Sequence, residues 1–198
     1  NGVKWHDGQP FTAEDVKFGM ERTMDLQTFP ESPGFYSAEY FLGGDKFDGP
    51  YSSKGKKALD SISVDGMTIT SKMAKPFPGM AYWAAFPANG PIPQGDASDP
   101  AKYRLHPIAT GPYMFDKYTP EKSLTLVRNP NWDPATDPGR TAYPDGYDMR
   151  FDVQSEKIDQ ILFNDQGDAK NTMTYDDVLA PDLRKFQDEA PDRLITGA

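Results

Sequence analysis

Histidine is a common catalytic base and metal ligand, and this sequence has only two histidines, His6 and His106. Each stands before a turn or a proline, and neither belongs to an HxH or HxxxH pattern that would place two imidazoles on one metal ion. The chain contains no cysteine, which excludes disulfides and thiolate metal sites. The sequence therefore predicts neither a metal ion nor a cofactor.

Acidic side chains occur as neighbouring pairs, and general acid–base catalysis often uses two carboxylates. The pairs are Glu14–Asp15, Asp176–Asp177 and Asp188–Glu189. All three lie at expected helix starts or on solvated faces, so we interpret them as surface charge. Residues 165–168 resemble part of a calcium loop but lack its alternating aspartates and terminal glutamate. With no GxSxG and no phosphate-binding loop either, we predict no catalytic residue.

Aromatic side chains are the more informative group. Phe35, Tyr36 and Tyr40 follow Ser32-Pro33-Gly34 in a stretch, 27–57, that is expected to be mostly loop. Loop aromatics form either a small local core or the wall of a ligand site, and spacing alone favours the core. Trp132 is expected to be a packing anchor.

Composition limits the class of protein. Of the 198 residues, 37% are apolar and 13% aromatic, enough to build a core. A formal charge of -9 disfavours binding to nucleic acids and to anionic lipid. The longest apolar stretch, 80–86, is far shorter than the roughly 20 residues of a spanning helix. The chain opens at Asn1 directly in a strand-like pattern, so we expect an N-terminal segment, with any export signal, to be missing.

Hydrophobic spacing and turn residues predict short elements separated by many turns. Thr12 and Asp15 have the spacing of a capping box for a helix that ends near Met24, and Gly19 on this helix predicts close packing. The other expected elements are a strand at 2–8, a hairpin at 62–70 around Asp65-Gly66, a buried helix at 80–86, paired strands at 111–115 and 124–127, a strand with one buried face at 147–153, and helices at 155–163, capped by Ser155, and 179–186, begun by Pro181.

Three segments, in order, resemble a known family. Residues 2–16, GVKWHDGQPFTAEDV, are similar to a strand, turn and helix start of the bacterial extracellular solute-binding proteins of family 5. Residues 109–113, ATGPY, resemble the start of a strand in that family, and 124–132, LTLVRNPNW, resemble a strand followed by Arg-Asn-Pro. The chain departs from the family pattern where Asp133 replaces the usual glycine.

The resemblance implies an α/β fold with a mixed sheet, forming part of lobe one of a two-lobed periplasmic-binding-protein-like fold. On this basis 1–103 would be an inserted subdomain, 104–198 would be the returning part of the lobe-one sheet domain, and the second lobe would be absent. Family members line the pocket with a tyrosine just after a Ser-Pro pair. An extra residue follows Ser32-Pro33 here, so the resemblance assigns the ligand-binding role to Tyr36 first and to Phe35 second.

The resemblance also implies a function. A family member binds a small solute, most often a di- or oligopeptide, by closure of its lobes without catalysis, and delivers it to the membrane permease of an ABC importer. We expect a monomer at the extracellular face of the membrane or in the periplasm. Two alternatives remain open: the ligand-sensing domain of a transcriptional regulator with the same fold, or a secreted carbohydrate-active protein, suggested by the acidic pairs with Trp5, Trp83 and Trp132.

Overall fold

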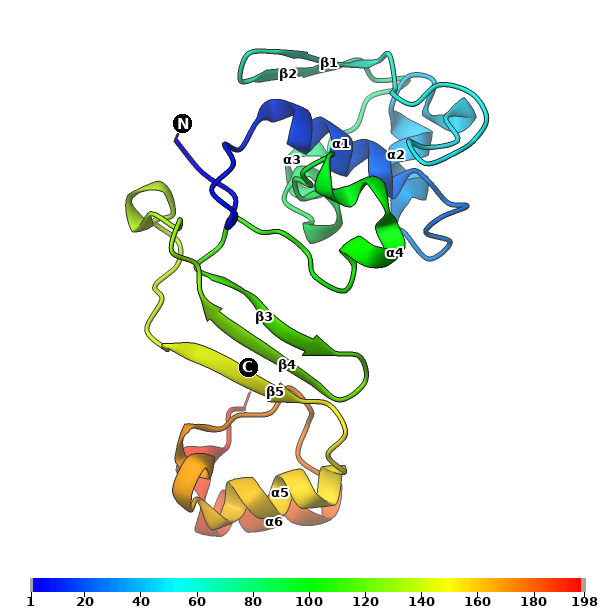
Figure 1. Cartoon of the computed structure of the whole chain (residues 1–198). Helices are drawn as coiled ribbons and strands as arrows, with labels where there is room; N and C mark the ends of the chain where they lie inside the picture. The colour runs from blue at the N-terminus through cyan, green and yellow to red at the C-terminus, as the bar shows by residue number, and fades with distance from the viewer. Residues whose placement is uncertain (1, 197–198) are drawn as a thin grey trace. The chain divides into compact units, whose positions relative to one another are not determined.

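The computed structural model describes residues 2–196 (Figure 1). The chain forms two compact units, one from Asn1–Tyr118 with Leu124–Asp148 and one from Thr119–Ser123 with Met149–Ala198. Short helices are mixed with a two-stranded and a three-stranded sheet, which confirms the mixed α/β class. The expected boundary near residue 103 falls inside the first unit. The assignment of 1–103 and 104–198 to parts of one lobe concerns a longer protein and stays a prediction.

Helix α1 (Ala13–Thr23) begins as the sequence predicts. The Thr12 hydroxyl accepts the Asp15 backbone N–H at 3.3 Å, and the Asp15 carboxylate accepts the Thr12 backbone N–H at 2.9 Å. Asp15 also accepts the indole N–H of buried Trp5 at 3.2 Å, which ties the residues before the helix to its first turn. Caps of this kind stabilise a helix by about 1 kcal/mol.

The prediction of a strand at 2–8 is wrong. The backbone pairs only through an isolated bridge between Lys4 and Pro10. The chain reverses at the predicted Asp7-Gly8 turn, where the Trp5 N–H donates to the Gln9 carbonyl at 2.9 Å. A strand needs a partner along its length, and this turn brings residues 9–11 back too soon to form more than a bridge.

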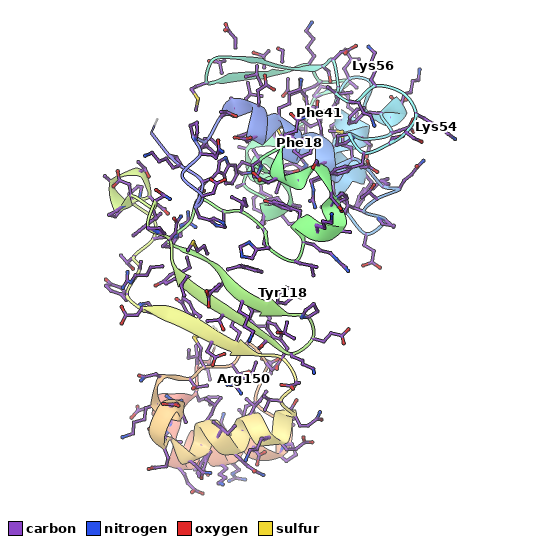
Figure 2. The ribbon with its side chains drawn as sticks, viewed as in Figure 1. Phe18, Phe41, Lys54, Lys56, Tyr118 and Arg150 are labelled. Atoms are coloured by element: carbon purple, nitrogen blue, oxygen red, sulfur yellow. The ribbon has the colours of Figure 1, made fainter. Side chains whose placement is uncertain are left out.

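The main core lies under α1. Figure 2 shows Phe41 among the side chains that fill this part of the first unit. The buried members of the cluster are Met20, Met24, Phe41, Leu59, Ile62 and Trp83. A second cluster, on another side of α1, packs Phe18 against Ala97 and Tyr103. Gly19 makes the close approach that the sequence predicts, since a Cβ there would lie 2.1 Å from the carbonyl oxygen of Gly90.

The hairpin of β1 (Ile62–Asp65) and β2 (Thr68–Ser71) is confirmed, with antiparallel pairs from Ile62↔Ser71 to Asp65↔Thr68. The turn residues are Gly66 and Met67, one position later than the expected Asp65-Gly66. Gly66 has φ +57, a left-handed conformation that glycine adopts at little cost.

Strands β3 (Tyr113–Thr119), β4 (Ser123–Arg128) and β5 (Gly146–Arg150) form the second sheet, in that order. The β3–β4 hairpin is confirmed. The prediction that the strand at 147–153 has one buried face is wrong, because Tyr147, Met149 and Phe151 are all exposed. Alternation fixes which side chains share a face of a strand, whereas burial requires another layer to cover that face.

The second unit pairs α5 (Ser155–Asn164) with α6 (Ala180–Glu189), both close to expectation. Phe163 and Phe186 meet edge to face, with 5.5 Å between ring centroids. The buried Asp159 carboxylate accepts the Leu179 N–H at 3.0 Å, at the start of α6. The expected cap at Ser155 is wrong: Gln154 occupies the N-cap and makes no side-chain cap bond.

The remaining helices are short. They are α2 (Gly34–Tyr40), α3 (Met80–Ala84), α4 (Pro100–Tyr103) and the 3-10 turns η1 (Gly44–Lys46), η2 (Pro87–Asn89), η3 (Asp96–Ser98), η4 (Pro134–Thr136), η5 (Gly167–Asn171) and η6 (Pro191–Arg193). Among residues 2–196, no helix has both the length and the apolar character to cross a bilayer.

Candidate functional site

Phe35 and Tyr36 lie on a helix, α2, within the stretch 27–57 that was expected to form loops and at most one short helix. Ser32 fixes the start of this helix: its hydroxyl donates to the Thr23 carbonyl at 2.7 Å and accepts the Gly34 N–H at 3.3 Å. Gly34 itself is buried against the end of α1. Tertiary contacts with α1 therefore give this Gly- and Pro-containing segment a helical form that its composition does not favour.

The two rings form an exposed aromatic pair. Phe35 is 54% exposed and Tyr36 is 49% exposed, with 4.2 Å between ring centroids and planes tilted by 34°. Two large rings side by side offer an apolar surface, and Tyr36 adds a hydroxyl that can donate or accept a hydrogen bond. Such a surface suits a ligand with an apolar side chain and a polar backbone.

A layer of aromatic rings continues behind this pair. Tyr40, on the same helix, stacks on Phe77 with 4.0 Å between centroids, and the Lys75 ammonium lies 4.5 Å from the Tyr40 ring. Phe77 contacts the buried Trp83, which contacts Phe41 in the core. The chain of rings attaches α2 to the rigid part of the unit, so this helix holds the exposed pair on a preorganised support.

Helix α3 is the second place where aromatic side chains reach the surface. The sequence predicts a buried helix at 80–86, but Tyr82 is 87% exposed and Phe86 is also exposed. Trp83 turns into the core, partly buried Met80 packs against the same core, and the Asn89 side-chain amide donates to the Trp83 carbonyl at 2.9 Å. An apolar run has no period that marks one face as outward, so these exposed rings could not be predicted from the sequence.

An open groove of about 920 Å³ lies in the first unit. Five consecutive residues, Ile108–Pro112, line it together with Arg140 and Tyr147. Arg140 pairs with Asp137 at 2.7 Å, and its guanidinium lies against Gly111, where a Cβ would be 3.0 Å from Nη1. The sequence does not predict this groove, because its walls come from four separate parts of the chain: Trp5, residues 87–91, residues 108–113 and residues 139–147.

A smaller hollow of about 530 Å³ lies at the C-terminal end of α1. Arg22 and Phe29 line it, and the Arg22 guanidinium stacks on the Phe29 ring at 4.1 Å. Ser32, which begins the segment that leads to the aromatic pair, also lines it. This hollow therefore adjoins α2 in sequence, with a cation next to an aromatic face.

The carboxylates of the described residues do not form a metal centre. No group of three or more potential ligands among residues 2–196 could hold a metal ion. The buried acids have structural partners instead: Glu21 accepts the Leu59 N–H at 2.8 Å, and Asp25 accepts the N–H groups of Thr28 and Tyr51 at 3.0 Å each. Burial raises the pKa of Glu21, and Lys17 at 3.8 Å opposes that shift.

The tryptophans that suggested a carbohydrate-active protein do not form an exposed platform among the described residues. Trp5 and Trp83 are buried, and the indole N–H of half-buried Trp132 donates to Asp137 at 3.0 Å. The two histidines, in contrast, meet across a hundred residues of sequence, with 6.1 Å between ring centroids. Neither their types nor their positions in the chain predict this contact.

Comparison with known proteins identifies the family. The sequence model described as bacterial extracellular solute-binding proteins, family 5 Middle, matches residues 1–182. The chain belongs to this family.

The family 5 chain is 25% identical over 194 residues to the oligopeptide-binding protein OppA of Bacillus subtilis, a match that covers 94% of this chain and 29% of the relative. It is also 24% identical over 141 residues to the probable deoxycholate-binding periplasmic protein YgiS of Escherichia coli, covering 67% of this chain and 25% of that protein.

A solved structure agrees with this assignment. The clavulanic acid biosynthesis oligopeptide binding protein 2 superimposes on the family 5 chain with a TM-score of 0.83 and 26% identity. The superposition covers 98% of this chain but 34% of the solved one. The chain thus spans about a third or less of the length of the relatives it matches.

Proposed function

We propose that this chain forms part of the ligand-binding wall of a longer solute-binding protein that captures small peptides for an ABC importer. Membership of family 5 supports the general role. The names of the Bacillus subtilis relative and of the superimposed structure, both oligopeptide-binding proteins, support a peptide as the solute.

The observation that carries this proposal is the exposed pair of Phe35 and Tyr36 on the anchored helix α2. Rings that are half exposed in the described chain would be covered once a peptide and an opposing protein surface pack on them. The apolar faces would contact a peptide side chain, and the Tyr36 hydroxyl would bond to the peptide backbone. Tyr36 is proposed as the main contact and Phe35 as the second.

Capture needs no chemical step. A ligand that contacts two surfaces at once favours the state in which they have closed on it, through its differential contacts with the closed state. The whole protein would act outside the cytoplasmic membrane as a monomer, pass its peptide to a permease and leave the peptide intact.

Isothermal titration calorimetry on the longer protein and on residues 1–198 alone tests the proposal. We expect micromolar binding of di- or tripeptides by the longer protein and none by the chain alone, because one wall leaves much of the ligand's polar surface facing water. Deoxycholate serves as a comparison ligand, because one relative carries it in its name. Micromolar peptide binding by residues 1–198 alone would contradict the proposal that this chain forms only one wall of the ligand site. A longer protein that binds deoxycholate and no peptide would overturn the choice of solute.

A further inference from the structure

His6 connects three segments that are far apart in the sequence, all within the first unit. Its backbone N–H donates to the Ala109 carbonyl at 3.0 Å, and its carbonyl accepts the side-chain amide of Asn131 at 2.9 Å. Its ring takes part as well, because the Ala109 N–H donates to His6 Nδ1 at 3.4 Å. One residue thus holds the N-terminal turn, the segment before β3 and the turn after β4.

The contact with the ring requires a neutral imidazole. Nδ1 can accept the Ala109 N–H only when it carries no proton, so the proton of the neutral ring sits on Nε2. Protonation would place an N–H on Nδ1, pointing at the Ala109 N–H. The two donors would repel each other, and the Ala109 N–H would lose its partner.

The charged and titratable groups around His6 oppose its protonation on balance. Burial lowers the pKa of His6, and His106, which meets it edge to face at 6.1 Å, lowers it further. Asp7 and Asp96 raise it, but with less effect. Because the folded pKa lies below the unfolded value, the neutral ring contributes stability above the unfolded pKa, and this stability is lost as pH falls through the folded pKa.

We propose that His6 is an acid-sensitive joint that holds residues 106–112 on the N-terminal turn when neutral and releases them when protonated. The released segment includes Ile108–Pro112, which line the larger groove, and it leads directly into β3. Acid would therefore reshape one wall of that groove. The joint does not depend on the identity of the ligand.

Nuclear magnetic resonance of residues 1–198 tests the joint directly. Imidazole nitrogen shifts should show the Nε2–H form of His6 at neutral pH and a pKa of His6 below the usual value for histidine. Exchange of the Ala109 amide, corrected for its intrinsic pH dependence, should accelerate as pH falls from about 7.5 to about 5. A His6 ring that is already protonated at neutral pH, or an Ala109 amide whose corrected exchange does not change, would overturn the proposal.

Two variants distinguish the effect of protonating the His6 ring from other effects of low pH on the protein. His6→Asn keeps an acceptor near the Nδ1 position but cannot gain a proton in this range, so Ala109 should stay protected at low pH. His106→Asn removes the neighbour that lowers the pKa of His6 and should move release to higher pH. In chemical unfolding, the parent should lose at most about tenfold in its folding equilibrium constant per pH unit relative to His6→Asn. Equal pH dependence of parent and His6→Asn would refute the joint. Should His6→Asn not fold, the titration of the parent chain decides.

Discussion

The α-carbon of Gly34 lies directly against the carbonyl of Thr23. A Cβ built on Gly34 would be 1.8 Å from the Thr23 oxygen and 2.5 Å from its carbonyl carbon. This contact sets how closely the start of α2 approaches the end of α1. The position of Phe35 and Tyr36, one and two residues later, follows from it.

Gly34→Ala should destabilise the chain by about 1–3 kcal/mol or more, because the added methyl group meets backbone atoms that cannot move aside alone. Urea unfolding measures the effect. Gly95→Ala is the matched control, since Gly95 has a right-handed helical conformation and no atom within 4 Å of its would-be Cβ. The control should unfold at the parent midpoint or slightly above it. Equal stability of Gly34→Ala and the parent would show that α2 lies farther from α1.

Removal of the exposed rings should affect binding without affecting folding. In the longer protein, Tyr36→Ala should weaken peptide binding about tenfold or more, and Phe35→Ala should weaken it less. Calorimetry measures both, and thermal unfolding should stay near that of the parent because the rings are half exposed. Tyr175→Ala, at a fully exposed tyrosine of the second unit, is the control and should leave affinity unchanged. Parent-like affinity of both ring variants would exclude the pair from the ligand site.

Glu21 should produce a pH-dependent loss of stability. Burial raises the pKa of Glu21 above the usual value for a glutamate, so the folded state holds this proton more tightly than the unfolded state. The stability is then full below the unfolded pKa and declines as pH rises through the raised folded value. Glu21→Gln keeps an acceptor for the Leu59 N–H but has no proton to lose.

Urea unfolding of parent and Glu21→Gln across about pH 4 to 7 tests this sign. The stability of the variant relative to the parent should increase as pH rises. Glu31→Gln, at an exposed position, is the control and should show no such trend. A trend of opposite sign would mean that Lys17 and the Leu59 N–H outweigh the effect of burial.

The elements predicted correctly have their causes close together in the sequence. The capping box of α1 depends on Thr12 and Asp15, three residues apart, and the β1–β2 hairpin depends on a short alternating stretch with Gly66 at its turn. Gly19 was also correctly marked as a point of close packing. For the capping box and the hairpin, local geometry limits the choices before any distant partner is present, whereas Gly19 packs against the distant Gly90.

Most of the incorrect predictions concern what covers a surface or pairs with it, whereas the cap expected at Ser155 and the position of the β1–β2 turn are local errors. The stretch 2–8 was expected to be a strand and 80–86 to be buried, yet the first finds a single bridge partner and the second leaves Tyr82 in solvent. The same holds for Phe35 and Tyr36. Their types suggested either a core or a ligand wall, and their exposure on α2 depends on the packing of Gly34 against Thr23.

Local patterns were enough to predict the mixed class, the start of α1, the β1–β2 hairpin and, through three short segments, the family. Folding was needed to bring His6 to His106, to place Ile108–Pro112 and Arg140 around one groove, and to leave the aromatic pair exposed on a helix. The difference lies in the distance along the chain over which each interaction acts. Caps and turns act between neighbours in the chain, whereas burial and contact depend on segments that only folding brings together.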